Sequence, residues 1–350
     1  MKTRLFFPTS SHDVSTIARS IFQRSQTTFA VAAITFIAAA FSLTIAAPIV
    51  LSIGIVFLFA GPHNYVEARY FLTRLPARMG RLRPFFVFSS TGVILLTITL
   101  PFAARVPRWM GWSPESVLWT FALWNTSLVL WCTTLVWMRS RQPPRRNWDY
   151  AWPIGLGVIG LACLQPVWLP LLLVYVHPLM GLWVLDREIA ARRPEWQSVY
   201  RLALWSVLPL IAAIWAVGPD SNFTNSLFEI PAGLHGQITQ HSGAVLLPML
   251  NADKLIATHA FLELLHYGAW LVAIPAASGR VFSKRFHDIP LMKRSIVSRR
   301  MIQVLLWGSA FVVAVLWICF AADYSTTRDV YFTVATLHVL AEVPFLLRLL

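Results

Sequence analysis

The chain has few charged side chains, because Asp, Glu, Lys and Arg make up only 13% of its 350 residues. Soluble globular domains carry about twice that share. Acidic residues are the scarcer class: 15 Asp and Glu stand against 29 Lys and Arg, a formal net charge of +14. The three cysteines are too scattered for a disulfide framework or a Cys-x-x-Cys metal site. These deficits exclude a soluble enzyme, a disordered chain and a nucleic-acid binder with a water-facing surface.

Long apolar runs take the place of the missing charges, since 57% of the residues are hydrophobic. Runs near the 20 residues needed for one membrane crossing predict an all-α, polytopic integral membrane helical bundle of about ten transmembrane helices. The predicted spans cover 28–46, 48–68, 84–104, 116–138, 151–164, 167–185, 201–217, 256–276, 301–321 and 330–350. The fifth span has only 14 residues, which suits a half-helix or a re-entrant segment.

Basic residues occupy alternate loops of this arrangement. With the N-terminus in the cytoplasm, 25 of the 29 Lys and Arg lie on the cytoplasmic side, as the positive-inside rule requires. We therefore expect both termini to be cytoplasmic, with 1–27 as a cytoplasmic N-terminal segment. Residues 28–350 would form a single transmembrane domain with an outside loop at 218–255.

No cleavable signal peptide is evident in residues 1–27, so the first apolar run would serve as its own insertion signal. Only four of the basic residues are Lys, a bias typical of GC-rich bacterial genomes. We therefore expect a multi-pass protein of the bacterial cytoplasmic (inner) membrane. Membrane lipids and a lipophilic small molecule are the expected partners.

Ionisable groups inside the predicted spans are few, and each needs a reason because placing a charge in hydrocarbon is costly. All three glutamates in the spans follow a histidine by four residues. The pairs are His63 and Glu67, His259 and Glu263, and His338 and Glu342. Chance spacing of nine His and seven Glu in 350 positions predicts fewer than one such pair. Residues four apart share one helix face, so each pair presents an imidazole and a carboxylate together.

Two further histidines extend this pattern. His266 follows His259 by seven residues and returns to the same face, which gives one span a His–Glu–His stripe. His177 directly precedes Pro178, and Pro62 directly precedes His63. Proline removes a helix hydrogen bond, so we expect the helices to break beside these two histidines.

The predicted depths of the histidines can be compared directly, because all their spans run from outside to inside. At about 1.5 Å per residue, His177, His266 and His338 lie about 12–15 Å below the outer surface, near the bilayer centre. His63 lies about 22 Å deep, within reach of them, whereas His259 lies only about 5 Å deep. The spacing therefore predicts convergence of four histidines and a shallower position for His259.

Five histidines and three carboxylates on four helices favour a metal or haem site over a proton or ion relay and over purely structural hydrogen bonds. Neutral imidazole is the commonest transition-metal ligand in proteins. The expected metal ligands are His63, His177, His259, His266 and His338. Glu67, Glu263 and Glu342 are the expected catalytic groups, which would orient the imidazole rings or transfer protons.

Short motifs surround three of these histidines. Gly61-Pro62-His63 ends an apolar run, Tyr175-Val-His177 is followed by Asp186, and Thr336-Leu-His338 lies near the C-terminus. In these motifs the chain resembles the Brp/Blh family of membrane β-carotene 15,15′-dioxygenases. The resemblance implies a multispan fold, an iron ion held by histidines buried in its helices, and a carotenoid-like substrate.

The chain departs from the family pattern at three places. Asn64 stands where the family has a glycine after the first histidine, and Leu337 stands where it has a proline before the last. The family's closely spaced histidine pair would fall on His259 and Glu263, or be stretched to His259 and His266. These departures bear on the ligand set that the resemblance implies.

The expected function is that of a membrane-embedded, metal-dependent oxidoreductase of the non-haem iron oxygenase type, acting on a lipophilic substrate with Fe(II) and O2. Apolar substrates and O2 both concentrate in lipid, and neutral ligands leave coordination positions open. A haem-binding membrane electron carrier is one alternative. The other is a non-enzymatic transporter or assembly factor that passes a metal or protons along His–Glu pairs.

The charge pattern makes a testable prediction about topology. Reporter fusions after residues 110, 235 and 325 should report the outside, and those after 75, 143, 193 and 290 the cytoplasm, because the basic residues cluster at the second set. An inside signal at residue 235 would contradict the assignment and the comparison of depths that depends on it.

Overall fold

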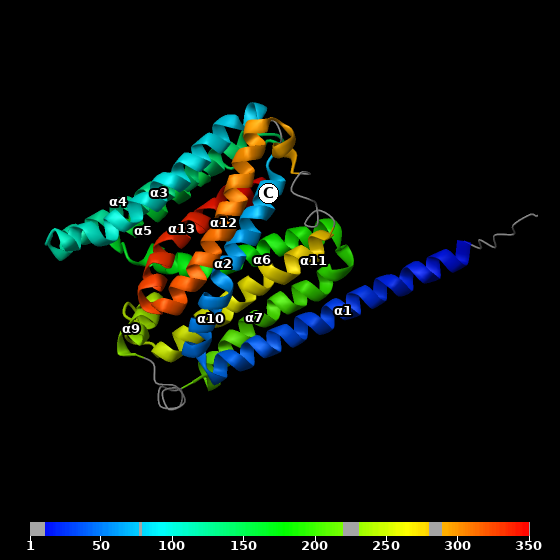
Figure 1. The fold of residues 1–350 in the computed structure, drawn as a ribbon, viewed down its shortest axis with the longest axis horizontal. Coiled ribbons are helices and arrows are strands. Elements are labelled where there is room, and N and C mark those ends of the chain that lie inside the picture. The colour runs from blue at the N-terminus through cyan, green and yellow to red at the C-terminus, as the bar shows by residue number, and fades with distance from the viewer. Residues whose placement is uncertain (1–10, 77–78, 220–230, 280–288, 350) are drawn as a thin grey trace, which may run out of the picture.

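The structure is a computed structural model that describes residues 11–76, 79–219, 231–279 and 289–349. Every regular element in these ranges is a helix, and the helices pack as a bundle (Figure 1). The predicted class, an all-α polytopic membrane bundle, is confirmed. Residues 220–230, part of the predicted outside loop, lie outside the described residues, as do residues 280–288 between the predicted spans 256–276 and 301–321.

Each predicted span falls on a helix, and the ends differ by at most seven residues except at the start of α1. They are α1 (Ser11–Ala46), α2 (Pro48–Arg74), α3 (Arg83–Trp109), α4 (Pro114–Ser140), α5 (Ala151–Leu164), α6 (Trp168–Arg192), α7 (Gln197–Val217), α9 (Ala232–His241), α10 (Ala252–Gly268), α11 (Ile274–Ser278), α12 (Ile296–Ala322) and α13 (Tyr324–Leu349). A π-helical turn, η3 (Ala269–Ala273), joins α10 to α11. Short 3-10 turns precede α3, α7 and α12 at Gly80–Leu82, Pro194–Trp196 and Pro290–Lys293.

Nine helices of the described residues are long and apolar enough to cross a membrane, and the remaining predicted span is α5, with 14 residues. Helix α1 starts earlier than the predicted span, at Ser11, although its apolar stretch begins at Ser25. The predicted outside loop contains a helix, α9, that the sequence does not predict.

Helix α10 and its continuation form the centre of the bundle. In its apolar stretch 67% of the residues are buried, against 11% in α1 and in α12. Figure 1 shows α3, α4 and α5 on one side of this centre and α1 with α7 on the other. Helices α2, α6 and α13 pack between these groups, so the four helices that carry the buried histidines are neighbours.

The predicted helix breaks at two prolines are wrong. Helix α2 continues through Pro62 and α6 continues through Pro178. Each proline removes one N–H from the helix ladder, and in a packed bundle the neighbouring helices hold the rest of the segment in helical form. The irregular backbone lies instead at η3, one turn beyond His266.

The turn between α5 and α6 lies beside the interior of α4. Gly155 packs against Thr133, and the amide of Asn125 donates to the carbonyl of Pro166 at 2.6 Å. These contacts show that α5 runs antiparallel to α4. Asn125, which contacts Pro166 just after the end of α5, lies eleven residues into α4, so α5 ends about 15 Å short of the start of α4. A carbonyl at that depth has no water to accept from, so Asn125 supplies the donor.

At the opposite end of the bundle, Glu188 of α6 joins three helices. Its carboxylate accepts hydrogen bonds from Tyr70 at 2.8 Å, Ser278 at 3.0 Å and Arg192 at 3.0 Å, and it forms an ion pair with Arg74. The network ties α6 to α2 and α11. Because both oxygens of the carboxylate have hydrogen-bond partners, the network stabilises the packing of α2, α6 and α11 at this end of the bundle.

The contact of Asn125 makes a prediction about stability. Replacing Asn125 by Ala leaves the Pro166 carbonyl without a donor and should lower the free energy of unfolding by about 1–2 kcal/mol. Equilibrium unfolding in mixed detergent measures this change. Ser127→Ala is the matched control, because the Ser127 hydroxyl donates only to the Leu123 carbonyl of its own helix. Equal losses in the two variants would contradict the capping role of Asn125.

Candidate metal centre

Four histidines from four helices meet in the centre of the bundle. They are His63 of α2, His177 of α6, His266 of α10 and His338 of α13. The ring centroid of His177 lies 4.4 Å from that of His266 and 4.9 Å from that of His338. The centroid of His63 lies 5.1 Å from His266 and 5.0 Å from His338. Each ring therefore lies against two of the others, and His63 joins the three histidines that the sequence places near the bilayer centre.

Three of the four rings are held by an acceptor at Nδ1. His63 Nδ1 lies 2.9 Å from the Ala60 carbonyl, His266 Nδ1 lies 3.3 Å from the Pro178 carbonyl, and His177 Nδ1 lies 3.1 Å from Glu342 Oε2. An Nδ1–H that donates to an acceptor fixes the tautomer in which Nε2 carries the lone pair. The Nε2 atoms of His63 and His266 are buried and have no hydrogen-bond partner, and His177 Nε2 faces His338 Nε2 at 3.2 Å.

These nitrogens fit a metal ion. Ligand nitrogens about 2.0 Å from one tetrahedral ion lie about 3.3 Å from one another, close to the distance between His177 Nε2 and His338 Nε2. The ligand atoms of His63, His177 and His338 all lie within 4.8 Å of one another, as do those of His177, His266 and Glu342. A metal-bound imidazole usually donates one ring N–H to an acceptor and binds the metal through the lone pair of the other ring nitrogen, as these rings can.

The carboxylates of the centre are placed differently from the sequence prediction. Glu342 contacts His177 of α6 across the helix interface, whereas the spacing predicts a pair with His338 on its own helix. Glu67 lies 3.6 Å from His63 Nε2, as the spacing predicts. Both carboxylates are buried, with side-chain exposures of 2% and 0%, and each has one oxygen without a hydrogen-bond partner. A divalent cation nearby would favour the ionised form of both carboxylates.

The fifth predicted ligand, His259, does not join these four. It forms a separate group with Glu263, 3.6 Å from its Nδ1, and with His241 at the end of α9, whose ring centroid is 5.0 Å away. The ligand atoms of these three residues also lie within 4.8 Å of one another. Seven residues separate His259 from His266, which is about 10 Å along the helix, and this separation puts the two histidines in different groups.

His241 is the residue that sequence analysis missed, because it lies in the predicted loop. Burial, the nearby His259 ring and the positive charge of Arg328 hold the pKa of His241 well below its usual value. Its imidazole is therefore neutral at physiological pH and keeps a lone pair. Nothing in the local sequence distinguishes it from His235 on the same helix, since the difference arises only when α9 packs against α10 and α13.

A cavity of about 250 Å³ connects the two groups of histidines. His177 and His338 line it at one end, and His241, His259 and Glu263 line it at the other. His63 and His266 lie behind this surface with exposures of 1% each. The side chain of His177, by contrast, is 15% exposed and lines the cavity. The centre is thus open toward the cavity on one side and packed on the other.

Apart from Thr336, the remaining walls of the cavity are apolar or aromatic. Leu100, Trp124, Leu173, Val174, Phe332 and Val339 contribute to them. The volume lies just below the range of about 300–1,000 Å³ typical of small-molecule sites. The cavity therefore suits a small apolar molecule, or the reacting part of a longer one, rather than an entire carotenoid.

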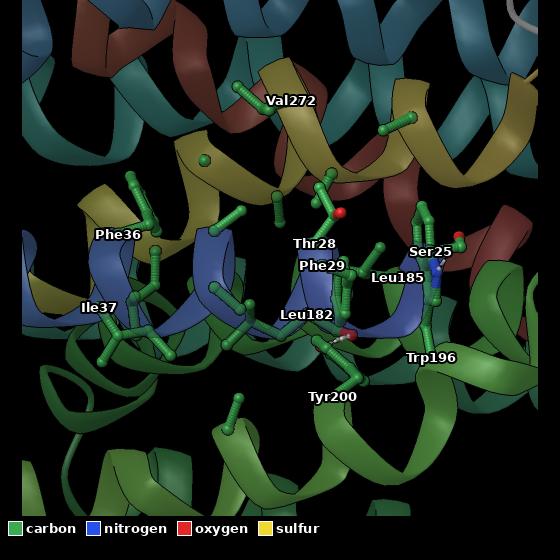
Figure 2. Close-up of a pocket in the computed structure, with 18 residues that line it drawn as sticks. Ser25, Thr28, Phe29, Phe36, Ile37, Leu182, Leu185, Trp196, Tyr200 and Val272 are labelled. Atoms are coloured by element: carbon green, nitrogen blue, oxygen red, sulfur yellow. Dashed lines mark hydrogen bonds between the residues drawn. The ribbon is translucent and has the colours of Figure 1, made fainter. Parts of the chain in front are cut away.

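A larger apolar pocket of about 780 Å³ lies on another face of α10, between α1, α6 and α7. Figure 2 shows Phe29, Phe36, Trp196, Tyr200 and Val272 among the residues that line it. The residues of α10 in its wall, such as Leu265 and Gly268, are turned more than 90° from His266 around the helix. The pocket suits lipid chains, and it is separate from the histidines.

Polar and aromatic neighbours complete the surroundings of the centre. Tyr267 places its ring 4.6 Å from that of His63, and Asn64 donates to the hydroxyl of Tyr331 at 3.4 Å. Tyr65, by contrast, packs against the hydrophobic cluster of Ile289, Met292, Ile302 and Leu306. Consecutive residues of α2 thus divide between the centre and a hydrophobic cluster on another side of the helix.

No family model, curated protein or solved structure matches this chain. The resemblance to the Brp/Blh family rests on the short motifs around His63, His177 and His338, and it stays a prediction. The functional inference therefore depends on the geometry and chemistry of the two histidine groups and of the cavity between them.

Gly181 of α6 permits the close approach of α10 at the centre, and this makes a prediction. A Cβ added there would lie 2.7 Å from His266 Nδ1 and 2.8 Å from Trp270 Nε1. Gly181→Ala should therefore displace His266 and lower the free energy of unfolding by about 1–3 kcal/mol. Gly160→Ala is the control, because a Cβ on Gly160 meets no atom within 4 Å and should stabilise α5. A neutral Gly181→Ala variant in detergent unfolding would contradict this packing.

Proposed function

We propose that the protein is a membrane-embedded, metal-dependent oxidoreductase of the non-haem iron type that acts on a lipophilic substrate. His63, His177, His266 and His338 would hold Fe(II). The observation that carries the proposal is the arrangement of hydrogen bonds: acceptors occupy the Nδ1 atoms of three rings, and the buried Nε2 atoms of His63 and His266 have no partner.

The charges around the centre support a cation. Four neutral imidazoles leave the double positive charge of Fe(II) uncompensated in a medium of low dielectric constant. Glu67 and Glu342 lie close enough to compensate it. When bound, ferrous iron held by neutral nitrogen ligands with open positions supplies the means to activate O2.

The residues of the chain have distinct roles in this proposal. Glu342 is a positioning residue, because it holds the Nδ1–H of His177 and thereby directs Nε2 toward His338. Glu67 lies beside His63 and is the carboxylate best placed to hold a proton next to the centre. The cavity places the substrate against His177 and His338 and excludes water through its apolar walls.

The packing of the rings argues against haem. His177 Nε2 and His338 Nε2 lie 3.2 Å apart and their rings are in contact, which leaves no room for a porphyrin between these two histidines. A metal transporter or assembly factor has a specific observation in its favour, because the cavity contacts a second group of potential ligands above the first.

Purification separates these alternatives. The protein, isolated in detergent and analysed by elemental analysis and absorption spectroscopy, should retain iron without a Soret band. A Soret band would favour the haem-binding electron carrier. Absence of retained metal, together with uptake of metal by vesicles that contain the protein, would favour transport.

Paired variants on α13 test which groups hold the metal. His338→Ala should abolish iron retention. Glu342→Gln keeps the shape of the side chain but removes its charge. It should lower metal affinity about 10–100-fold, the usual effect of losing a group that is hydrogen-bonded to a metal ligand. His235→Ala is the matched control, because His235 lies on α9 and faces Thr239 instead of the centre. Retention of iron is measured after equilibration with a calibrated chelator.

Two outcomes would contradict this assignment. If His338→Ala retains iron at the wild-type level, the four-histidine centre is wrong. If Glu342→Gln and Glu67→Gln each lose iron completely, the carboxylates are themselves ligands, and a carboxylate-bridged two-metal centre replaces the centre proposed above. A proton relay would show a third pattern, in which Glu→Gln variants lose activity without any change in metal content.

A further inference from the structure

His241, His259 and Glu263 form a group at the outer end of the cavity that the proposed centre does not use. Their ligand atoms all lie within 4.8 Å of one another. His259 and Glu263 are 4% and 8% exposed, and Glu263 Oε2 is buried without a hydrogen-bond partner. A carboxylate oxygen buried without a donor is costly, so its presence points to a ligand that the protein itself does not supply.

We propose that these three residues bind a second divalent transition-metal ion, separate from the ion held by the four histidines. Two imidazoles and one carboxylate are a ligand set that leaves open coordination positions for small molecules. The cavity is lined by all three residues, and the open positions would face it. The proposal stands on its own residues and does not depend on the function of the inner centre.

The position of His241 is built into the fold. The Tyr175 hydroxyl of α6 donates to the carbonyl of Ser242 at 2.8 Å, directly after the histidine. Gln237 of α9 donates to Asp329 of α13 at 3.2 Å. The ring of His241 packs on Phe332, with centroids 4.0 Å apart. A short helix outside the membrane-spanning segments is thus held by two transmembrane helices so that one histidine points at His259.

A positive charge also lies near this group. Arg328 of α13 is 2% exposed, and its guanidinium lies 4.6 Å from the Phe332 ring that also contacts His241. The inner centre has two carboxylates beside it, whereas the outer group has one carboxylate and this guanidinium. Electrostatics therefore predict that the outer site binds its ion more weakly than the inner one, by about tenfold or more.

Titration of the metal-free, detergent-purified full chain with Co²⁺ tests the proposal. Co²⁺ serves as the probe because its absorption bands report nitrogen and oxygen ligands, and elemental analysis gives the number of ions retained. The wild type should bind two equivalents in two steps. His241→Ala and Glu263→Gln should each lose the weaker step and keep the tighter one. His235→Ala, on the same helix as His241, should keep both.

Two further variants make the assignment specific. His338→Ala should lose the tighter step and keep the weaker one, so failure of the inner centre and failure of the outer site give different results. Arg328→Gln removes the nearby positive charge and should tighten the weaker step, an effect that a purely structural histidine group would not produce. Size-exclusion profiles of each variant confirm that the fold is retained.

The proposal is overturned if the wild type binds a single equivalent of Co²⁺ that His338→Ala removes. It is also overturned if two equivalents bind and both survive in His241→Ala and in Glu263→Gln. If His241→Ala does not fold, Glu263→Gln still tests the outer site, because it changes only one heavy atom of the side chain and is titrated in the same way.

Discussion

The contact of His177 with its two partners is the interaction on which the centre depends. One ring nitrogen lies 3.1 Å from Glu342 and the other lies 3.2 Å from His338, while the ring itself packs against His266. Inside a bilayer no water can replace a missing partner, so the position of each polar group is determined by the others. Helices α6, α10 and α13 are joined through this one imidazole.

Much of the fold and part of the centre could be predicted from the sequence. The apolar runs predict the spans, because a helix is the way for a continuous lipid-embedded segment to satisfy its own backbone. The depths of His177, His266 and His338 predict their common level, since helical rise is uniform and the spans share one direction. The spacing of His63 and Glu67 predicts a contact that depends only on one helix.

The features that the sequence does not reveal depend on contacts between helices. Spacing assigns Glu342 to His338, but α6 brings His177 nearer to that carboxylate. His241 belongs to a group because Tyr175 and Asp329 hold α9 in place. The breaks expected at Pro62 and Pro178 are absent, since packing against neighbouring helices maintains both helices. Local spacing predicts contacts within one helix but carries no information about which residue of another helix a side chain meets.

X-ray absorption at the iron edge tests whether four histidines hold the ion. For the protein purified with its metal, we expect a first shell dominated by about four nitrogen neighbours at about 2.0–2.2 Å, with the outer-shell scattering characteristic of imidazole rings. His338→Ala should lose this signal. A first shell made mainly of oxygen, or the scattering pattern of a porphyrin, would contradict a centre in which four histidines hold the ion.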